Sequence, residues 1–443
     1  MTDTLPRVLV LDLTAWRKDS TAHTLMDIFS CWDPDKLALV YCSSELPDSN
    51  KCSNYFQISE SQMIRSVLKP WIKVGRRVEN TPRNDDKDTV REQKMYRDAH
   101  KNNRKWMRLA REVVWKLGHW KTGELDKFVK EFNPDIIFVP IFPYAYPGRI
   151  QQHIFKLTGK PTVCYLADDN YSYDACSDWM DYLQRTWVRK YVGPLARNSS
   201  DMFVIVEKEK EDTDARFGTD SKILTKGIDF SNRPYVEHKI NDPIQFIYTG
   251  GLIIGRDRTL ALVADAINKV NKEKGHVVAE LNIYSQTTPS DAIMARINHG
   301  ASHFCGQVSR DDVLRLQSQA DVAIFAESLV GKEANKAKLS FSTKITDYLG
   351  NGKCVFAIGK DYIAPIDYFV RNDSAIVATD EAEIENKIRT LIDNPDLITE
   401  YGRKAYDCAI RNHERSMINK RFIDCMTHVA NEHITKEHKL NRQ

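Results

Sequence analysis

The sequence lacks several features that would fix its class at once. It has no Cys-x-x-Cys pair and no low-complexity tract, and no apolar run approaches the ~20 residues that a membrane-spanning helix needs. Its nine cysteines are an odd number, and several fall in expected strands, which favours buried reduced thiols over disulfides. The histidines have no metal-ligand spacing, and no signal-peptide pattern precedes the first apolar segment. We therefore expect a cytoplasmic protein without a metal site.

Length and composition indicate a globular protein of two domains. The chain has 443 residues, of which 42% are hydrophobic and 28% are charged. Its net charge of +3 hides a local imbalance, because residues 61–122 hold 17 Lys and Arg against 7 Asp and Glu. This excess suits an anionic partner. We find no known nucleic-acid-binding module, however, and expect no nucleic acid partner.

Short apolar strands alternate with helices through the first half of the chain. This alternation predicts a parallel, doubly wound sheet. The expected strands are Val8–Leu13, Leu37–Tyr41, Asp135–Pro140, Pro161–Leu166, Asp201–Val206 and Ser221–Thr225.

The same alternation begins again after a polar joint at 229–243. We therefore predict an α/β protein with two Rossmann-like domains that face each other across a cleft, where ligands usually bind. The domains are expected at 1–233, with a basic insertion at about 61–122, and at 241–410. Residues 411–443 are expected to form a C-terminal helix, with a return to the first domain as one option. The strands of the second domain are expected at Ile244–Tyr248, Glu280–Tyr284, Ser302–Cys305, Asp321–Phe325 and Cys354–Ile358.

One segment of the second domain has the residues of a phosphate site. Ser342 and Thr343 are natural N-caps of a short helix, and Lys344 follows them. The free N–H groups of a helix N-terminus, two hydroxyls and a lysine together attract phosphate oxygens. Asp347, one turn further along, is placed to reach sugar hydroxyls beyond that phosphate, which suggests a nucleotide-sugar. The alternative is an ordinary N-cap followed by a solvated helical turn.

The layout and motifs resemble the GT-B glycosyltransferases, in particular the retaining family 4, which is common in bacterial surface-polysaccharide synthesis. Residues 248–256 are similar to the family's glycine-containing donor loop, in which Gly250 matches the glycine and Arg256 falls at the diphosphate-binding lysine. Gly251 replaces the usual arginine of that loop, and Arg258 is a candidate to supply the missing charge.

Two further segments carry the resemblance. His303–Val308 is similar to the strand end whose backbone contacts the base, which makes Gln307 and Val308 donor-binding candidates. Residues 339–358 look like the family's last donor motif, in which Asp347 stands where a ribose-binding Glu usually sits. Leu339 replaces the first Glu of the fuller pattern, and that Glu helps to place the sugar.

Catalytic and acceptor candidates follow two strands of the first domain. Asp168 and Asp169 come after the strand that ends at Leu166. They either position an acceptor hydroxyl or line the anomeric centre, or they form an ordinary cap and turn. Thr14 and Trp16 stand where the family shapes its acceptor loop, without the usual glycines. Trp16 either stacks on a sugar or packs in the core.

The basic segment contains two apolar-basic pieces, at 64–77 and 101–121. Tryptophans beside a cationic face suit an anionic membrane surface, where each basic residue contributes ~1 kcal/mol. The alternative is a helix that packs on its own domain with solvated charges. In the second piece, an apolar stripe at helical spacing is flanked by basic residues: Trp106, Leu109, Val113, Leu117 and Trp120, with Arg104, Lys105, Arg108, Arg111 and Lys116.

These observations and the resemblance predict a glycosyltransferase that moves a sugar from a nucleotide diphospho-sugar to a polysaccharide or lipid-linked glycan acceptor. The resemblance implies retention of configuration and no cofactor or metal. Arg256 and Lys344 would then neutralise the departing diphosphate, where negative charge grows in the transition state. Two alternatives remain, namely a GT-B sugar-nucleotide epimerase and a catalytically silent GT-B subunit. Binding of lipid by the basic segment would place the protein on the inner face of the cell membrane.

Overall fold

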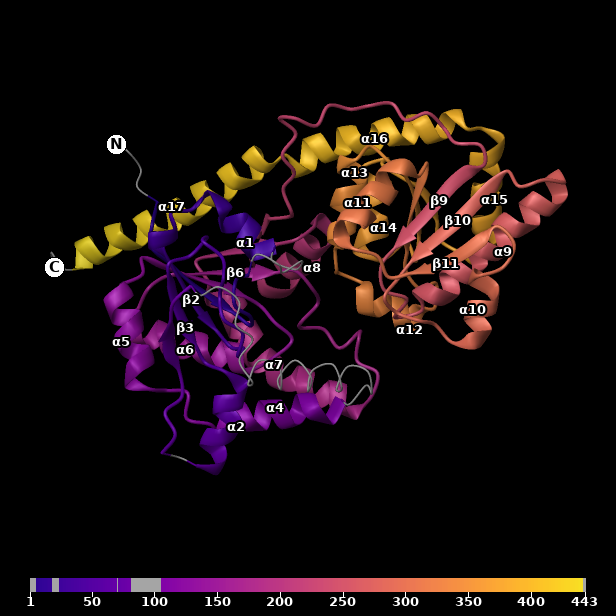
Figure 1. Ribbon diagram of the computed structural model, residues 1–443. Coiled ribbons are helices and arrows are strands. Elements are labelled where there is room, and N and C mark those ends of the chain that lie inside the picture. Colours follow the sequence, from indigo (N-terminus) through magenta and orange to yellow (C-terminus); the bar gives the residue numbers. More distant parts are fainter. Residues whose placement is uncertain (1–4, 18–23, 70, 81–104, 441–443) are drawn as a thin grey trace. The chain divides into compact units, whose positions relative to one another are not determined.

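The chain divides into two compact units, each described here by itself. The computed structural model describes residues 5–17, 24–69, 71–80 and 105–440 (Figure 1). We call residues Met1–Val204, Lys210–Leu224 and Asn419–Gln443 the N-terminal unit, and Ile205–Glu209 with Thr225–Ile418 the C-terminal unit. Helices α8 (Glu207–Phe217) and α17 (Arg415–Leu440) each begin in the C-terminal unit and end in the N-terminal unit.

The N-terminal unit is built on an eight-stranded sheet in the order β4-β3-β2-β1-β5-β6-β7-β8. Strand β4 runs antiparallel to β3, and the other neighbouring strands are parallel. Every residue of β1, β2, β5 and β6 is buried, as expected for strands covered on both faces by helices. The strands are β1 (Val8–Asp12), β2 (Leu37–Tyr41), β3 (Asn54–Gln57), β4 (Arg76–Val78), β5 (Ile136–Pro140), β6 (Thr162–Leu166), β7 (Asp201–Val204) and β8 (Lys222–Ile223).

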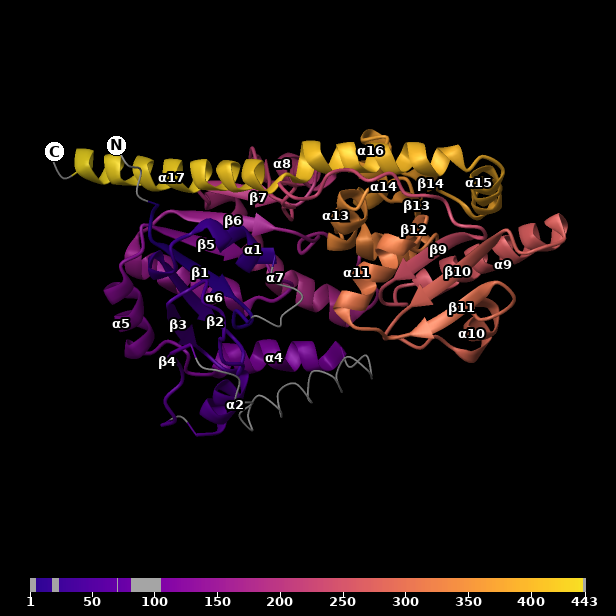
Figure 2. The same cartoon turned by 45° about the horizontal axis from the view of Figure 1, so that its top comes forward.

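The helices of this unit cover both faces of the sheet, and the end of α17 is one of them (Figure 2). The Phe422 ring of α17 packs edge-on against Phe29 and Phe138, with ring centroids 5.0 and 5.7 Å apart. The last part of the chain therefore completes the core of the unit that holds its beginning. The other helices are α1 (Thr24–Ile28), α2 (Glu60–Leu68), α4 (Lys105–Leu117), α5 (Gly123–Phe132), α6 (Tyr146–Thr158) and α7 (Trp179–Asn198).

The C-terminal unit is built on a six-stranded, parallel sheet in the order β11-β10-β9-β12-β13-β14. Its strands are β9 (Ile244–Thr249), β10 (Ala279–Tyr284), β11 (Ser302–Gly306), β12 (Val322–Ala326), β13 (Cys354–Ile358) and β14 (Ile376–Ala378). Its helices are α9 (Arg256–Lys274), α10 (Asp291–Ile297), α11 (Arg310–Gln319), α12 (Gly331–Ala334), α13 (Thr343–Gly350), α14 (Ala364–Arg371), α15 (Glu381–Asp393) and α16 (Asp396–His413).

The strand order of the C-terminal unit tells where a ligand binds. Counted from β9, the sheet has the order 3-2-1-4-5-6 of doubly wound nucleotide-binding folds. The order reverses between β9 and β12, and the crevice outside the carboxyl ends of those two strands is the expected ligand site. In the N-terminal unit the equivalent position lies between β1 and β5.

The structure contains all the strands expected from the sequence and three more. Strand β3 has only Tyr55 and Phe56 as apolar residues, β4 has the sequence Arg-Arg-Val, and β14 has three residues, so none produces a recognisable apolar run. Neither α17 nor any other helix in the described part of the chain is both long and apolar enough to cross a membrane.

Candidate functional site

The loop after β9 approaches the rest of the C-terminal unit through a glycine. Gly250 has φ of +148°, a conformation that residues with a side chain rarely adopt. A Cβ atom at this position would overlap with Nζ of Lys344. The hydroxyl of Tyr248 donates to the carbonyl oxygen of Gly251 at 2.9 Å and closes the turn. The glycine predicted for the donor loop is therefore required by local geometry.

Lys344 lies in the first turn of α13 and extends its side chain to this loop. The Ser342 hydroxyl accepts a hydrogen bond from the Lys344 backbone N–H at 3.4 Å, so Ser342 caps the helix. The Lys344 ammonium lies 5.2 Å from the centroid of the Tyr248 ring. Within the described residues it has neither a hydrogen bond nor an ion pair. Thr343 beside it is exposed.

The surroundings of Lys344 disfavour its charge. Burial and the positive charge of Arg256 lower the pKa of Lys344 to about 8, although Glu327 acts in the opposite direction. An ammonium in such a place is stabilised by any anion that reaches it. The position beside a glycine turn, at the crevice between β9 and β12, suits a phosphate group.

Arg256 has a partner that sequence reasoning did not find. Its Nε and one terminal nitrogen donate to the two carboxylate oxygens of Glu327 at 2.9 and 2.6 Å. Glu327 is 3% exposed and directly follows β12. The bidentate pair fixes the guanidinium at the first residue of α9. A carboxylate directly after an apolar strand was the available sequence signal.

The second predicted cation, Arg258, also has a carboxylate partner. It forms an ion pair with Glu333, which in turn accepts a hydrogen bond from the Ser328 hydroxyl at 2.8 Å. Arg258 is therefore no simple replacement for the arginine that Gly251 displaces, because its charge is already compensated. Of the three predicted cations, Lys344 is the one without a carboxylate partner among the described residues.

Asp347, the predicted ribose ligand, is held by a lysine from the segment that enters this unit. Lys226 donates to its Oδ1 at 2.6 Å. The helix that carries Asp347 is fixed by buried hydrogen bonds, since the hydroxyls of Tyr348 and Thr249 lie 3.2 Å apart and Gln317 donates to Thr249 at 2.7 Å. These bonds connect α13 to the end of β9, so the loop with Gly250 and the helix with Lys344 are held together.

The remaining donor candidates lie further along the same sheet. Gln307 and Val308 follow β11, two strands from β9, and Gln307 is exposed. Leu339, at the position of the family's first Glu, is 3% exposed. It therefore packs in the interior.

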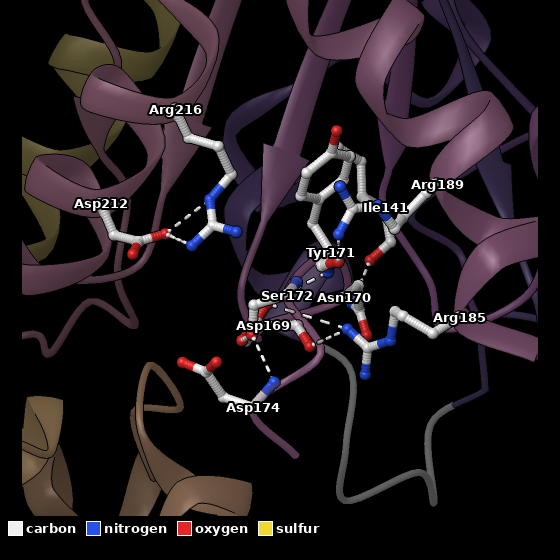
Figure 3. A network of polar contacts seen from close by, with 10 residues as sticks. All are labelled: Ile141, Asp169, Asn170, Tyr171, Ser172, Asp174, Arg185, Arg189, Asp212 and Arg216. Atoms are coloured by element: carbon white, nitrogen blue, oxygen red, sulfur yellow. Dashed lines mark hydrogen bonds and ion pairs between the residues drawn. The ribbon is translucent and has the colours of Figure 1, made fainter. Parts of the chain in front are cut away.

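In the N-terminal unit, Asp169 holds a turn together (Figure 3). Its carboxylate accepts hydrogen bonds from the backbone N–H of Tyr171 at 3.1 Å and of Ser172 at 2.7 Å. Burial alone would raise the pKa of Asp169. A hydrogen bond from the Ser172 hydroxyl, the two backbone bonds and the charge of Arg185 outweigh burial and hold the pKa below its usual value. A carboxylate with this many donors is a poor base, so the turn-forming alternative describes Asp169.

The other candidates of this unit differ in exposure. Asp168 is exposed in the loop after β6, and Thr14 is partly exposed after β1. Trp16 has no exposed surface, and its indole N–H donates to Asp12 Oδ2 at 3.1 Å. The expectation that Trp16 stacks on a sugar is therefore wrong, because the ring packs in the core against Phe29.

The basic segment also differs from its expected arrangement. The residues of α4 that face inward are Glu112 and Trp115, whereas Trp106 of the predicted stripe is 57% exposed. Lys105 is bonded to Asp178 and Asp181, each at 2.6 Å. Arg108 and Arg111 likewise have carboxylate partners, and Arg104 lies outside the described residues. Most of the predicted cationic flank therefore serves internal ion pairs.

Within the described part of the chain, no group of three or more His, Cys, Asp or Glu side chains is placed to hold a metal ion. The positive charges at the carboxyl edge of the C-terminal sheet come from Lys344, Arg256 and Arg258. The C-terminal unit thus combines a doubly wound sheet with cationic side chains at the carboxyl edge of its strands.

Comparisons with known proteins agree with this class. Residues 264–422 match the family model described as glycosyl transferase-like. Among solved structures, the chain is similar to Anabaena HepE in complex with UDP, with a TM-score of 0.61 and 13% identity over 95% of this chain and 99% of that chain. It is also similar to TarM, with a TM-score of 0.59 and 10% identity over 96% and 100% of the two chains.

A third similar structure is the sucrose-phosphate synthase of Thermosynechococcus elongatus, with a TM-score of 0.55 and 10% identity over 94% of this chain and 97% of that chain. No curated protein matches the sequence. These likenesses cover nearly the whole chain and confirm the predicted fold class. The protein has the GT-B fold of glycosyltransferases.

Proposed function

We propose that the protein transfers a sugar from a nucleotide diphospho-sugar, which binds at the carboxyl edge of the C-terminal sheet. Lys344 carries this proposal, because its ammonium lies beside the Gly250 turn without a carboxylate partner among the described residues. The diphosphate of a donor supplies the missing negative charge. Solved HepE in complex with UDP and glucose supports the choice of ligand, since the two chains share one fold.

Three residues divide the work at this position. Lys344 neutralises the diphosphate. Arg256 lies at the start of α9, where Glu327 balances its charge and fixes its direction, so that Arg256 contributes oriented N–H groups. As the bond to the sugar breaks, negative charge grows on the departing nucleoside diphosphate, and preformed cations stabilise it. Asp347 remains the candidate for the ribose hydroxyls, with Lys226 holding one carboxylate oxygen. The reaction needs no metal in this scheme.

The finer assignments follow the resemblance to family 4. They are a hexosyl transfer with retention of configuration, a polysaccharide or lipid-linked glycan acceptor of the cell envelope, and a cytoplasmic protein at the inner membrane surface. In the N-terminal unit, Asp168 is the candidate to contact an acceptor, because it is exposed in the loop after β6.

Isothermal titration of the full chain with UDP, GDP, ADP and dTDP tests the proposal. We expect one nucleotide to bind and Lys344→Met to weaken that binding. Lys272→Met, which removes an exposed lysine at the far end of α9, should leave it unchanged. If none of the four nucleotides binds, the donor site is not where we place it.

Two other functions remain as outcomes of a second experiment. The protein is incubated with the matching nucleotide-sugar, and the products are identified by mass spectrometry and NMR. Transfer to an acceptor extract supports the transferase. Conversion of the sugar into an epimer without transfer would show an epimerase. Binding with neither reaction would show a silent subunit, a result that Leu339 in place of the family's Glu would explain.

A further inference from the structure

A second cationic site lies in the N-terminal unit, away from the carboxyl ends of its strands. A groove of about 430 Å³ is lined by the end of α4, the loop to α5, the outer face of α6 and Tyr191 of α7. Its basic lining residues are Lys116, Lys121, Arg149 and Lys156, with His119 and His153 beside them. Among the described residues, no Asp or Glu lines this groove.

The charges in the groove are only partly compensated. Arg149 lies 3.4 Å from Glu112, and His153 lies 2.7 Å from Asp126. Lys116, Lys121 and Lys156 are exposed, and no hydrogen bond or ion pair to a described residue compensates their ammonium groups. Three positive charges therefore converge on a space without a carboxylate, and such a space attracts an anion.

Aromatic side chains form the floor of the groove. Trp115 has no exposed surface and stacks on Tyr146 with ring centroids 4.2 Å apart. Its indole N–H has no hydrogen-bond acceptor within the described part of the chain, which is a costly arrangement for a buried donor. Lys121 lies over the Trp120 ring at 5.4 Å. Rigid rings with a surrounding set of donors suit a phosphate-bearing ligand with some apolar surface.

The helices around the groove also expose large apolar side chains. Leu117, next to Lys116 on α4, is 58% exposed, and Phe155, next to Lys156 on α6, is 47% exposed. Helix α2 packs on α4 through an ion pair between Glu60 and Arg111 at 3.0 Å. It adds Leu68, and the loop that follows adds Trp71, each of them 76% exposed. Apolar groups beside exposed lysines are the pattern of a bilayer-surface contact.

We propose that this groove binds the phosphate of an anionic phospholipid headgroup, while the apolar side chains of α2, α4 and α6 enter the bilayer beside it. This inference deepens the proposed function, because a lipid-linked acceptor is carried by the same bilayer. It keeps Lys116 and Lys121 of the expected basic piece at 101–121 and adds Lys156 of α6, whereas Lys105 and Arg108 are used inside the unit.

Co-sedimentation with vesicles of phosphatidylcholine, with and without phosphatidylglycerol, tests the proposal. Binding is expected to require phosphatidylglycerol. The triple variant Lys116→Gln, Lys121→Gln, Lys156→Gln should lower the partition coefficient about 100-fold, since each basic residue at an anionic surface contributes ~1 kcal/mol. A matched triple, Lys130→Gln, Lys190→Gln, Lys272→Gln, removes three other exposed lysines. It should change the partition less than about threefold.

Further arms decide between a lipid and a soluble anion. Leu117→Ser with Leu68→Ser should also reduce vesicle binding, and millimolar inorganic phosphate should not abolish it. Equal losses in the two lysine triples would overturn the proposal, as would competition by free phosphate with no effect of the serine changes. Titration of the Lys116→Gln, Lys121→Gln, Lys156→Gln variant with nucleotide distinguishes the groove from the donor site. Unchanged nucleotide affinity with lost vesicle binding supports the groove, and failure of vesicle binding alone leaves the donor site standing.

Discussion

The two units share the central strand order of a doubly wound sheet but differ at the edge where such sheets bind ligands. In the C-terminal unit, the strand order reverses between β9 and β12. There the loop with Gly250 meets the ammonium of Lys344, which has no carboxylate partner among the described residues. At the equivalent edge of the N-terminal unit, the buried Trp16 donates a hydrogen bond to Asp12, and Asp169 accepts a hydrogen bond from the backbone N–H of Ser172 in its own turn. The same edge therefore presents a lysine without a carboxylate partner among the described residues in one unit, and side chains bonded within the unit in the other.

This difference shows what topology decides and what side chains decide. The strand order fixes where loops converge, and both units obey it. Whether a convergent edge binds phosphate depends on leaving a positive charge uncompensated. Glu327 forms an ion pair with Arg256 and Glu333 with Arg258, whereas Lys344 has no carboxylate partner among the described residues.

The largest effect, a loss of stability, is expected from Trp16→Ala at the carboxyl edge of the N-terminal sheet. Loss of a fully buried Trp should lower the free energy of unfolding by about 4 kcal/mol, because it leaves a cavity next to Phe29 and removes the hydrogen bond that Asp12 accepts from the indole. Nucleotide affinity should not change. Urea unfolding and calorimetric titration measure both quantities. If the alanine variant does not fold, Trp16→Phe, which keeps most of the side-chain volume, replaces it. A loss of nucleotide binding in either variant would show that Trp16 contributes to the nucleotide site, contrary to the proposed difference between the units.

Lys344→Met, at the carboxyl edge of the C-terminal sheet, should have the opposite effects: it should weaken nucleotide binding and raise stability. Removal of a charge-assisted contact should weaken nucleotide binding about 30-fold, equivalent to ~2 kcal/mol. The pKa of Lys344 is lowered to about 8 in the folded protein, so its positive charge destabilises the folded state below that pH. The variant should therefore be more stable than the wild type at neutral pH, with the gain shrinking as pH rises above 8. A variant that loses both affinity and stability would indicate a structural lysine.

Gly250→Ala tests the backbone of the same edge. The added Cβ is strained at φ of +148° and displaces Nζ of Lys344, so nucleotide affinity should fall about 10-fold. Gly159→Ala is the matched change in the N-terminal unit, with φ of +65° and no atom within 4 Å of the new Cβ. It should cost about 1 kcal/mol of stability and leave affinity unchanged. Equal affinity losses in the two variants would show that the effect is not local to the donor loop.

The contrast also explains which features were predictable from the sequence. Strands such as β9 and β12 are apolar runs with turns on both sides, and Gly250 and Lys344 belong to motifs with local spacing. Glu327 was missed, because its pairing with Arg256 joins residues 71 positions apart. The inward face of α4 was misjudged for a similar reason. Glu112 looks like a surface charge until Arg149 and the backbone N–H of Ala145, which donates to it at 2.6 Å, are brought beside it by the fold.

The smallest effect expected is the pH dependence of donor binding. A nucleotide diphospho-sugar has no phosphate proton to lose near neutral pH, so a change of affinity there reports on the protein. With the pKa of Lys344 lowered to about 8, the ammonium loses its proton as pH rises through that value. Affinity should fall about threefold between about pH 7.5 and about pH 8.5. The neighbouring groups Arg256 and Tyr248 have their pKa values raised, which keeps them protonated throughout this range. The dependence should disappear in Lys344→Met, and its persistence in that variant would assign the titration to another group.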